Sequence, residues 1–167
     1  MIIISDTSPI NYLILTGDIE ILEKLFGRVV IPLAVFSELQ HAKAPQPVKD
    51  WIVQAPAWLE VKQAAEALFT PSRKLGNGER EAIALAMELK ADAVLIDDRD
   101  GTQEAREQSL IALGTVSVLE RAAEKDLLDL PAAIDRLSQT SFRFPPVEII
   151  EAMLERDRKR KAESCNN

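Results

Sequence analysis

Four acidic side chains lie where burial would be costly unless a cation neutralised them. Asp6 and Asp97 each follow a short apolar run directly, whereas Glu38 and Glu79 fall on helical stripes of small apolar residues. Carboxylate oxygens are the ligands that Mg²⁺ and Mn²⁺ prefer. Two such cations, about 3.5 to 4 Å apart, can activate a water and stabilise the leaving oxygen of a phosphodiester. Asp6, Glu38, Glu79 and Asp97 are therefore the candidate catalytic and metal-binding residues.

Each of these acids also has a structural interpretation. Asp6 and Asp97 stand where an aspartate can cap the helix that follows. Glu38 can lie at the solvent edge of its helix. Glu79 can stabilise the dipole of the helix whose first turn it occupies. None of the four is persuasive alone, and the hypothesis depends on their joint pattern.

The last acid of the set is not resolved by spacing. Asp98 and Asp100 follow Asp97 at once, and Asp97 is favoured because it ends the apolar run, with Asp98 second. Glu81 is turned about half-way round the helix from Glu79, so Glu79 is the better candidate for a shared pocket. Glu81 can still take or share the role of Glu79.

The composition is that of a globular domain and limits the chemistry. The 167 residues are 47% hydrophobic and 28% charged, with a formal net charge of -7, which argues against binding nucleic acid mainly by electrostatic attraction. The single cysteine, Cys165, excludes a disulfide framework and favours a reducing, cytoplasmic location. The acid at position 6 comes too early for a signal peptide, and no apolar run is long enough to span a membrane. With His41 as the only histidine, carboxylates are the expected working groups.

Short apolar segments alternate with helical patterns along the chain. We expect strands over Ile2–Ser5, Arg28–Ile31, Trp58–Val61 and Ala93–Ile96, and helices over Pro9–Leu15, Ile19–Phe26, Leu33–Ala42, Val48–Val53 and Glu79–Leu89. The alternation continues through Leu110–Leu113, Val116–Lys125 and Pro131–Gln139, before a last helix begins at Pro145–Pro146. This order predicts an α/β sandwich around a mainly parallel sheet, whose ligands lie beyond the carboxyl ends of the strands.

The C-terminal segment contains the one dense basic run, from Glu155 to Lys161. It can be a solvated helix end, because cations are favourable near the negative end of a helix dipole. It can also be a patch that contacts nucleic acid or an acidic partner.

Four motifs together resemble the prokaryotic PIN-domain family, and in particular its VapC-type toxins. They are Asp6-Thr-Ser-Pro after an apolar strand, Glu38 within Val-Phe-Ser-Glu-Leu, Gly78-Glu-Arg-Glu-Ala-Ile-Ala, and Val94-Leu-Ile-Asp-Asp-Arg. The match runs from about Ile2 to Gln139. The chain departs from the family's common Thr-x-Asp motif at Asp97, and from its commoner aspartate at Glu79.

The resemblance implies a PIN-like three-layer α/β/α sandwich that acts as a metal-dependent endoribonuclease. Residues 1–140 would form the nuclease domain, with the helix and basic tail of residues 141–167 packed on it or appended to it. Asp6, Glu38, Glu79 and Asp97 would bind Mg²⁺ or Mn²⁺, with Asp98 and Glu81 as further candidates, and Ser8 would help to position ligands. The implied partners are an RNA substrate, an antitoxin protein and a second copy of the chain.

Two other functions are compatible with the residues. A PIN-like module without catalysis would only bind RNA or protein, and it need not bind manganese at the acids. A phosphatase or phosphoacceptor domain would use one aspartate as a nucleophile. Such domains also need a well-placed lysine, and Lys74, Lys90 and Lys125 lie at no expected strand end.

Overall fold

The computed structural model describes residues 1–65 and 69–165, and its central feature is a five-stranded sheet. The strands are β1 (Ile3–Ser5), β2 (Val29–Pro32), β3 (Leu59–Lys62), β4 (Ala93–Leu95) and β5 (Ala112–Leu113). They lie in the order β3-β2-β1-β4-β5, and neighbouring strands are parallel. The prediction of an α/β sandwich around a mainly parallel sheet is confirmed.

The strands are short continuous apolar runs because both faces of the sheet are covered. Ile3 and Ile4 are successive residues of β1, and both are buried. Ile4 lies beside Val30 of β2 and Val94 of β4 in the register of the sheet. Parallel sheets covered by helices on both faces have this uninterrupted pattern, without alternating polar residues.

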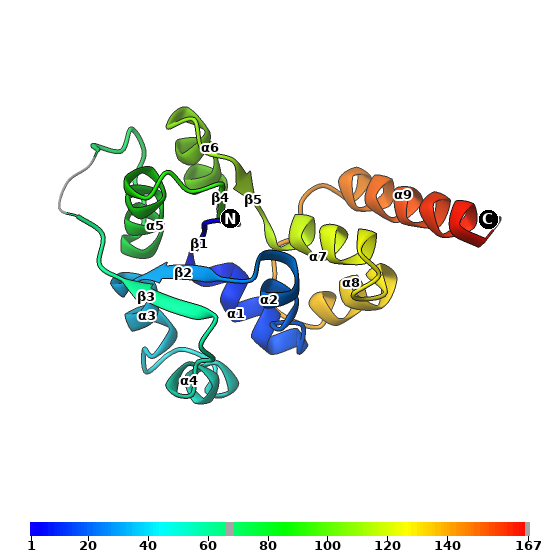
Figure 1. Cartoon of the computed structure of the whole chain (residues 1–167), viewed down its shortest axis with the longest axis horizontal. Coiled ribbons are helices and arrows are strands. Elements are labelled where there is room, and N and C mark those ends of the chain that lie inside the picture. Colours follow the sequence, from blue (N-terminus) through cyan, green and yellow to red (C-terminus); the bar gives the residue numbers. More distant parts are fainter. Residues whose placement is uncertain (66–68, 166–167) are drawn as a thin grey trace. The chain divides into compact units, whose positions relative to one another are not determined.

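Within the described residues of the first part of the chain, six helices accompany the sheet. They are α1 (Thr7–Thr16), α2 (Ile21–Phe26), α3 (Leu33–Leu39), α4 (Gln46–Val53), α5 (Asn77–Glu88) and α6 (Arg99–Glu107). Ala82, Ile83 and Ala86 of α5 share a core cluster with Ile4 and Val94. Since side chains alternate along a strand, Ile3 points to the face of the sheet opposite that of Ile4. Figure 1 shows α5 and α6 on one side of the sheet, with α1, α3 and α4 on the other.

Helix α6 was not predicted from the sequence. Its one apolar residue other than glycine is Ala105, so the segment lacks the apolar stripe of an amphipathic helix. Its buried face is instead completed by Gly101 and by the carboxylate of Glu104. A helix whose buried face carries a glycine and a glutamate is not visible to a hydrophobic-periodicity argument.

The direction of strand order reverses at β1, which lies between β2 and β4. In open parallel sheets, ligands bind beyond the carboxyl ends of the strands at such a reversal. Asp6 follows β1, and its backbone N–H donates to the carbonyl of Leu95 at 2.9 Å, at the end of β4. Asp97 comes two residues after Leu95. The topology therefore brings two of the predicted acids to the reversal point.

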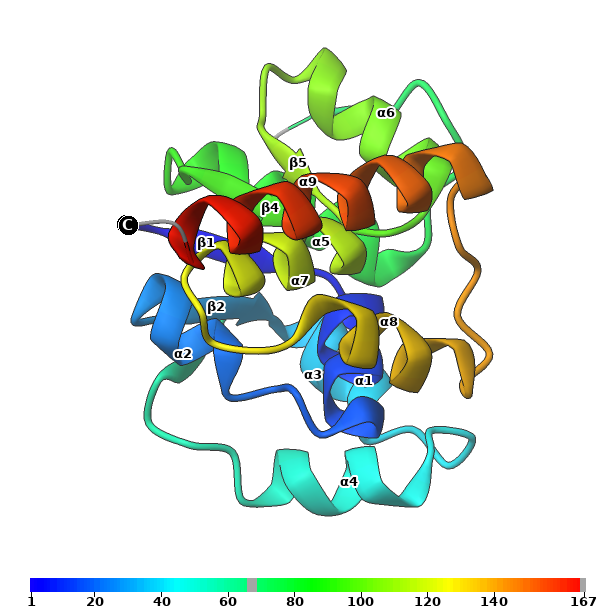
Figure 2. The same ribbon diagram turned by 90° about the vertical axis from the view of Figure 1, so that its right-hand side faces the viewer.

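The chain divides into two compact units, Met1–Thr115 and Val116–Asn167. The sheet belongs to the first, and the expected domain of residues 1–140 covers it together with part of the second. The remaining helices are α7 (Thr115–Glu124), α8 (Leu130–Ser138) and α9 (Val147–Cys165). Helix α9 lies beside α7 and α8 (Figures 1 and 2). Across the described residues, no helix combines the length and apolar character needed to cross a bilayer.

The basic run of α9 forms ion pairs with acids of the same unit. Arg156 pairs with Glu120 of α7 at 2.7 Å, and Arg160 pairs with Asp126 at 2.8 Å. The other pairs are Arg158 and Lys159 with Glu155, Lys161 with Asp129 and Asp157, and Arg160 with Asp157. Arg156, Arg160 and Lys161 of the run therefore tie α9 to neighbouring segments.

Asp157 is the buried acid of this network, and its replacement by alanine should destabilise the second unit. It pairs with Arg160 at 2.9 Å and Lys161 at 2.8 Å, so its removal leaves two partly buried cations without this partner. We expect a loss of about 1 to 3 kcal/mol in the free energy of unfolding, measured by urea denaturation. Glu155→Ala, which breaks only exposed pairs of the same helix, should have a much smaller effect. Equal losses in the two variants would contradict this interpretation.

Candidate active site

Asp6 is the most buried of the predicted acids, with 4% of its surface exposed. It occupies the N-cap position of α1, but its side chain makes no capping hydrogen bond. Burial is the main cause that raises the pKa of Asp6 to about 7, and the charges of Glu79, Glu38 and Asp97 add to it. These effects outweigh the hydrogen bond from the backbone of Thr7, which lowers the pKa. The capping explanation of Asp6 is therefore not supported, and the carboxylate is held where its own charge is unfavourable.

Glu38 lies near the end of α3 and is fixed by two hydrogen bonds from distant parts of the chain. The hydroxyl of Thr7 donates a short bond to Glu38 Oε2. The backbone N–H of Gly78 donates to Glu38 Oε1 at 3.0 Å. Glu38 is partly exposed. Its carboxylate is held between the starts of α1 and α5.

Gly78 allows the carboxylates of Asp6 and Glu38 to approach the same part of α5. A Cβ atom at Gly78 would stand 2.6 Å from Glu38 Oε2, 2.9 Å from Glu38 Oε1 and 3.0 Å from Asp6 Oδ1. Real Cβ atoms essentially never show distances under 3.0 Å, so any larger residue at position 78 would require the carboxylate of Glu38 to shift and would crowd that of Asp6. Neither this role of Gly78 nor the contact of Thr7 with Glu38 was predicted from the sequence.

Glu79 lies in the first turn of α5. Its Oε2 accepts a hydrogen bond from the backbone N–H of Gly76 at 3.0 Å, which stabilises the start of the helix. Burial raises the pKa of Glu79, with further contributions from Asp98, Glu38 and Asp100. Glu79 is thus both a helix-start residue and a member of the acid group.

The acids after β4 have different surroundings. Asp97 is partly buried, and its two oxygens accept hydrogen bonds of 2.7 Å from the backbone N–H and the hydroxyl of Thr115. Burial raises the pKa of Asp97 in spite of these bonds. Asp98 caps α6, because its Oδ2 accepts from the backbone N–H groups of Asp100 and Gly101. Capping is therefore the observed role of Asp98, whereas Asp97 is the acid whose charge raises the pKa of Asp6.

Two further candidates lie at the edge of the group. Glu81 accepts a hydrogen bond of 3.0 Å from the backbone N–H of Ala34, so it connects α5 to the first turn of α3. Ser8 is partly buried in the first turn of α1. In this turn of α1, the hydroxyl of its neighbour Thr7 contacts a carboxylate of the group.

The acids match a hard divalent cation in their chemistry, although their side chains do not converge on a single point. Among residues 1–65 and 69–165, no group of three or more Asp, Glu, His or Cys side chains is placed to hold a metal ion. Within the same residues, no lysine, arginine or histidine forms an ion pair with Asp6. A buried carboxylate needs positive charge nearby to be stably ionised. The oxygen donors present are those that Mg²⁺ and Mn²⁺ prefer.

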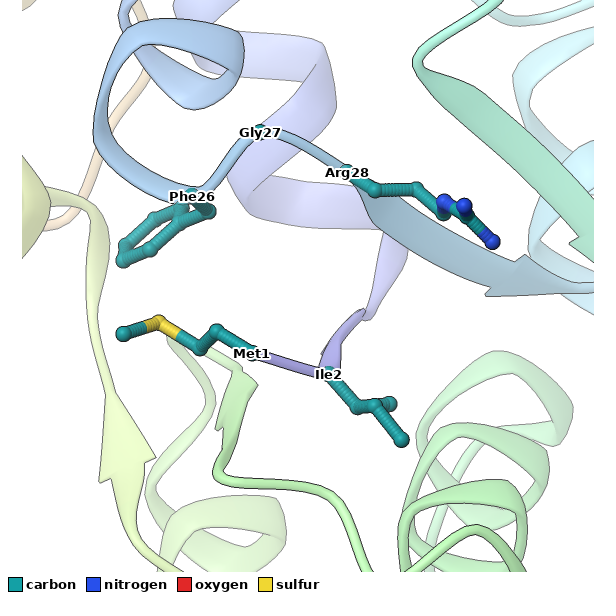
Figure 3. Close-up of a pocket in the computed structure, with 5 residues that line it drawn as sticks. All are labelled: Met1, Ile2, Phe26, Gly27 and Arg28. Carbon is teal, nitrogen blue, oxygen red and sulfur yellow. The ribbon is translucent and has the colours of Figure 1, made fainter.

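A pocket of about 450 Å³ lies elsewhere, beside the starts of β1 and β2. It is lined by Met1, Ile2, Phe26, Gly27 and Arg28. Figure 3 shows the side chains of Met1 and Phe26 facing each other across it. It contains none of the predicted acids, and it lies at the opposite ends of the strands from Asp6. The acids, and not this pocket, therefore remain the candidate site.

Comparison with known proteins agrees with the fold. Residues 2–158 match a protein family described as a PIN domain. No curated protein and no solved structure gives a significant match to the chain. Proteins with a PIN domain are generally nucleases and typically use divalent metal ions. From its match over nearly the whole length, this chain belongs to the PIN-domain family.

Proposed function

We propose that the protein is an endoribonuclease that hydrolyses RNA phosphodiester bonds with Mg²⁺ or Mn²⁺. The observation that carries the proposal is the buried carboxylate of Asp6 at the reversal of the sheet, with the charges of Glu38, Glu79 and Asp97 around it. Such an arrangement costs free energy in the absence of a cation. A function that needs a bound cation explains why the protein keeps this unfavourable arrangement of carboxylates.

In this proposal Asp6, Glu38, Glu79 and Asp97 bind the cation. Bound there, a divalent cation supplies an activated water and neutralises charge on the phosphate during in-line attack. The chain's other residues hold the ligands in place. Thr7 and the backbone of Gly78 orient the two oxygens of Glu38, and Thr115 orients Asp97. We assign Ser8 to ligand positioning, as the resemblance to the PIN-domain family implies.

We further propose that the chain is the toxin of a toxin–antitoxin pair, acting in the cytoplasm as a homodimer. The support is the resemblance of its four motifs to the VapC-type toxins. With a formal net charge of -7, the protein must bind RNA through the cation and local contacts rather than through its overall field. An antitoxin would inhibit it by covering the acids.

One observation favours a second candidate, a PIN-like module that binds RNA or protein without catalysis. In the described residues, the acids do not converge as a complete set of metal ligands. A binding module need not bind Mn²⁺ at these acids, and it would leave RNA intact when Mn²⁺ is present. Mn²⁺-dependent cleavage that Asp6→Asn abolishes would exclude this candidate.

The proposed reaction is tested with purified protein and end-labelled single-stranded RNA. We expect cleavage with Mn²⁺, no cleavage with excess chelator, and recovery when the metal is restored. Single-stranded DNA of the same sequence measures the preference for RNA. Cleavage that continues in excess chelator, or that survives in Asp6→Asn, would count against the proposal because it would come from another site or from a contaminant.

A further inference from the structure

Glu104 of α6 is a buried charged residue outside the candidate metal-binding set. Its side chain is 1% exposed. It lies one turn after Gly101 and therefore on the same face of α6. Burying a carboxylate this completely is unfavourable unless hydrogen bonds and charge compensate it. The structure supplies both, and all the compensation from outside α6 comes from one segment.

That segment is the loop before α5. The backbone N–H and the hydroxyl of Ser72 donate to Glu104 Oε2 at 3.1 and 2.9 Å. Arg73 Nη1 approaches the same oxygen at 3.4 Å and also pairs with Glu107. Gln108, at the C-cap of α6, donates to Glu104 Oε1 at 3.2 Å. We call these contacts the Glu104 clasp.

The clasp favours the ionised form of Glu104. Burial alone would raise its pKa, but the hydrogen bonds from Ser72 and Gln108 outweigh burial and lower the pKa below its ordinary value. A neutral glutamine at this position could still accept from Ser72. It would lose the charge that strengthens these hydrogen bonds.

The clasp connects to the acids through both of its ends. On the loop side, Arg73 precedes Gly76 by three residues, and Gly76 donates to Glu79 where α5 begins. On the helix side, a Cβ at Gly101 would stand 3.6 Å from the carboxyl carbon of Glu79. Helix α6 thus holds the loop before α5 through Glu104 and borders the carboxylate of Glu79 at Gly101.

We propose that Glu104 is a positioning residue that sets the place of Glu79 by fixing the loop before α5 to α6. The inference rests on the proposed function, because its consequence is the affinity of the acids for a divalent cation. Residues that orient ligands without touching the metal typically change metal affinity by about 10- to 100-fold. We therefore expect Glu104→Gln to weaken Mn²⁺ binding by roughly tenfold.

The test is calorimetric titration of the folded protein with Mn²⁺ alone, at a temperature well below its melting transition. Glu107→Gln is the matched control, because it weakens the more exposed contacts that Glu107 makes with Arg73 and the Ser72 hydroxyl but leaves both Ser72 hydrogen bonds to Glu104. It should change the affinity by less than about twofold. Ile52→Val, in the core at α4, controls for a general loss of stability and should leave the affinity unchanged.

A double-mutant cycle sharpens the test. Ser72→Ala removes a donor from the other side of the clasp, so its effect on Mn²⁺ affinity should not add to that of Glu104→Gln. The proposal would be overturned if Glu104→Gln bound Mn²⁺ as tightly as the wild type does. It would also be overturned if Ile52→Val, at the same melting temperature as Glu104→Gln, lost as much Mn²⁺ affinity. If the wild-type protein binds no Mn²⁺, the proposed function itself fails. That failure is distinguishable from failure of the Glu104 proposal, because it is seen before any variants are compared.

Discussion

Replacing Asp6 with asparagine is expected to abolish RNA cleavage and, at the same time, to stabilise the metal-free protein above pH 7. Both effects have one cause, the buried negative charge of Asp6. The variant keeps the size and shape of the side chain but cannot supply the anionic oxygen that a divalent cation requires. We expect cleavage to fall by at least about a hundredfold, and the heat of Mn²⁺ binding to disappear.

The stability effect follows from the raised pKa of Asp6. Its pKa is about 7 in the folded protein and 3.8 in the reference state, so the folded protein retains a proton that the unfolded chain has released. The contribution of Asp6 to the free energy of unfolding is fully present below about pH 4 and is lost as the pH rises to about 7. Asparagine removes that loss, which is worth on the order of 2 to 4 kcal/mol at pH 8.

Urea denaturation of the metal-free protein at pH 5 and pH 8 measures this difference. The wild-type protein should be less stable at pH 8, and Asp6→Asn should be much less sensitive to pH. A smaller slope remains, because the pKa values of Glu79 and Asp97 are also raised. Asp50→Asn, the same change at an exposed position of α4, should behave as the wild type does. Full cleavage by Asp6→Asn would refute the assignment of this residue.

Gly78→Ala is expected to disrupt the site although it adds only one methyl group. Gly78 lies in the first turn of α5, where alanine is a better helix former than glycine by about 1 kcal/mol. Helix propensity alone therefore predicts a small gain in stability. The new Cβ would, however, stand 2.6 Å from Glu38 Oε2 and 3.0 Å from Asp6 Oδ1, so both carboxylates must move.

A displacement of about 1 Å at a catalytic group can reduce the rate by about a hundredfold, and we expect a loss of that order. Cleavage rates and Mn²⁺ titration measure it. Gly76→Ala is the matched control, because a Cβ there would meet only Glu79 Oε2 at 3.8 Å, an ordinary contact. It should retain most of the activity. If Gly78→Ala and Gly76→Ala were equally active, close approach at Gly78 would have no role in the site.

The elements were largely predictable because their signals are local. The continuous apolar runs of β1, β2 and β4 and the alanine-rich α5 fall close to their predicted bounds. The positions of Asp6 and Asp97 at strand ends followed from these runs. Helix α6 had no such signal, since glutamate and glycine occupy its buried face.

The supporting contacts of the acids could not be predicted because they join distant parts of the chain. Thr7 and Glu38 are 31 residues apart, Gly78 and Glu38 are 40 apart, and Asp97 and Thr115 are 18 apart. Periodicity describes which residues share a face of one element, and it carries no information about which residue of another element lies opposite. Thr7 and Thr115 are ordinary hydroxyl residues in the sequence, and only the fold gives them their partners.

The bond between Asp97 and Thr115 has a consequence during synthesis. The acids of the site begin at residue 6, yet the last of them is oriented by a residue 18 positions further along. At about 5 to 20 residues per second, a ribosome needs roughly 5 to 20 seconds to pass from Asp6 to Thr115. Until Thr115 has been added, Asp97 lacks the residue that orients it, so under the proposed function the site is finished only when the first unit is complete.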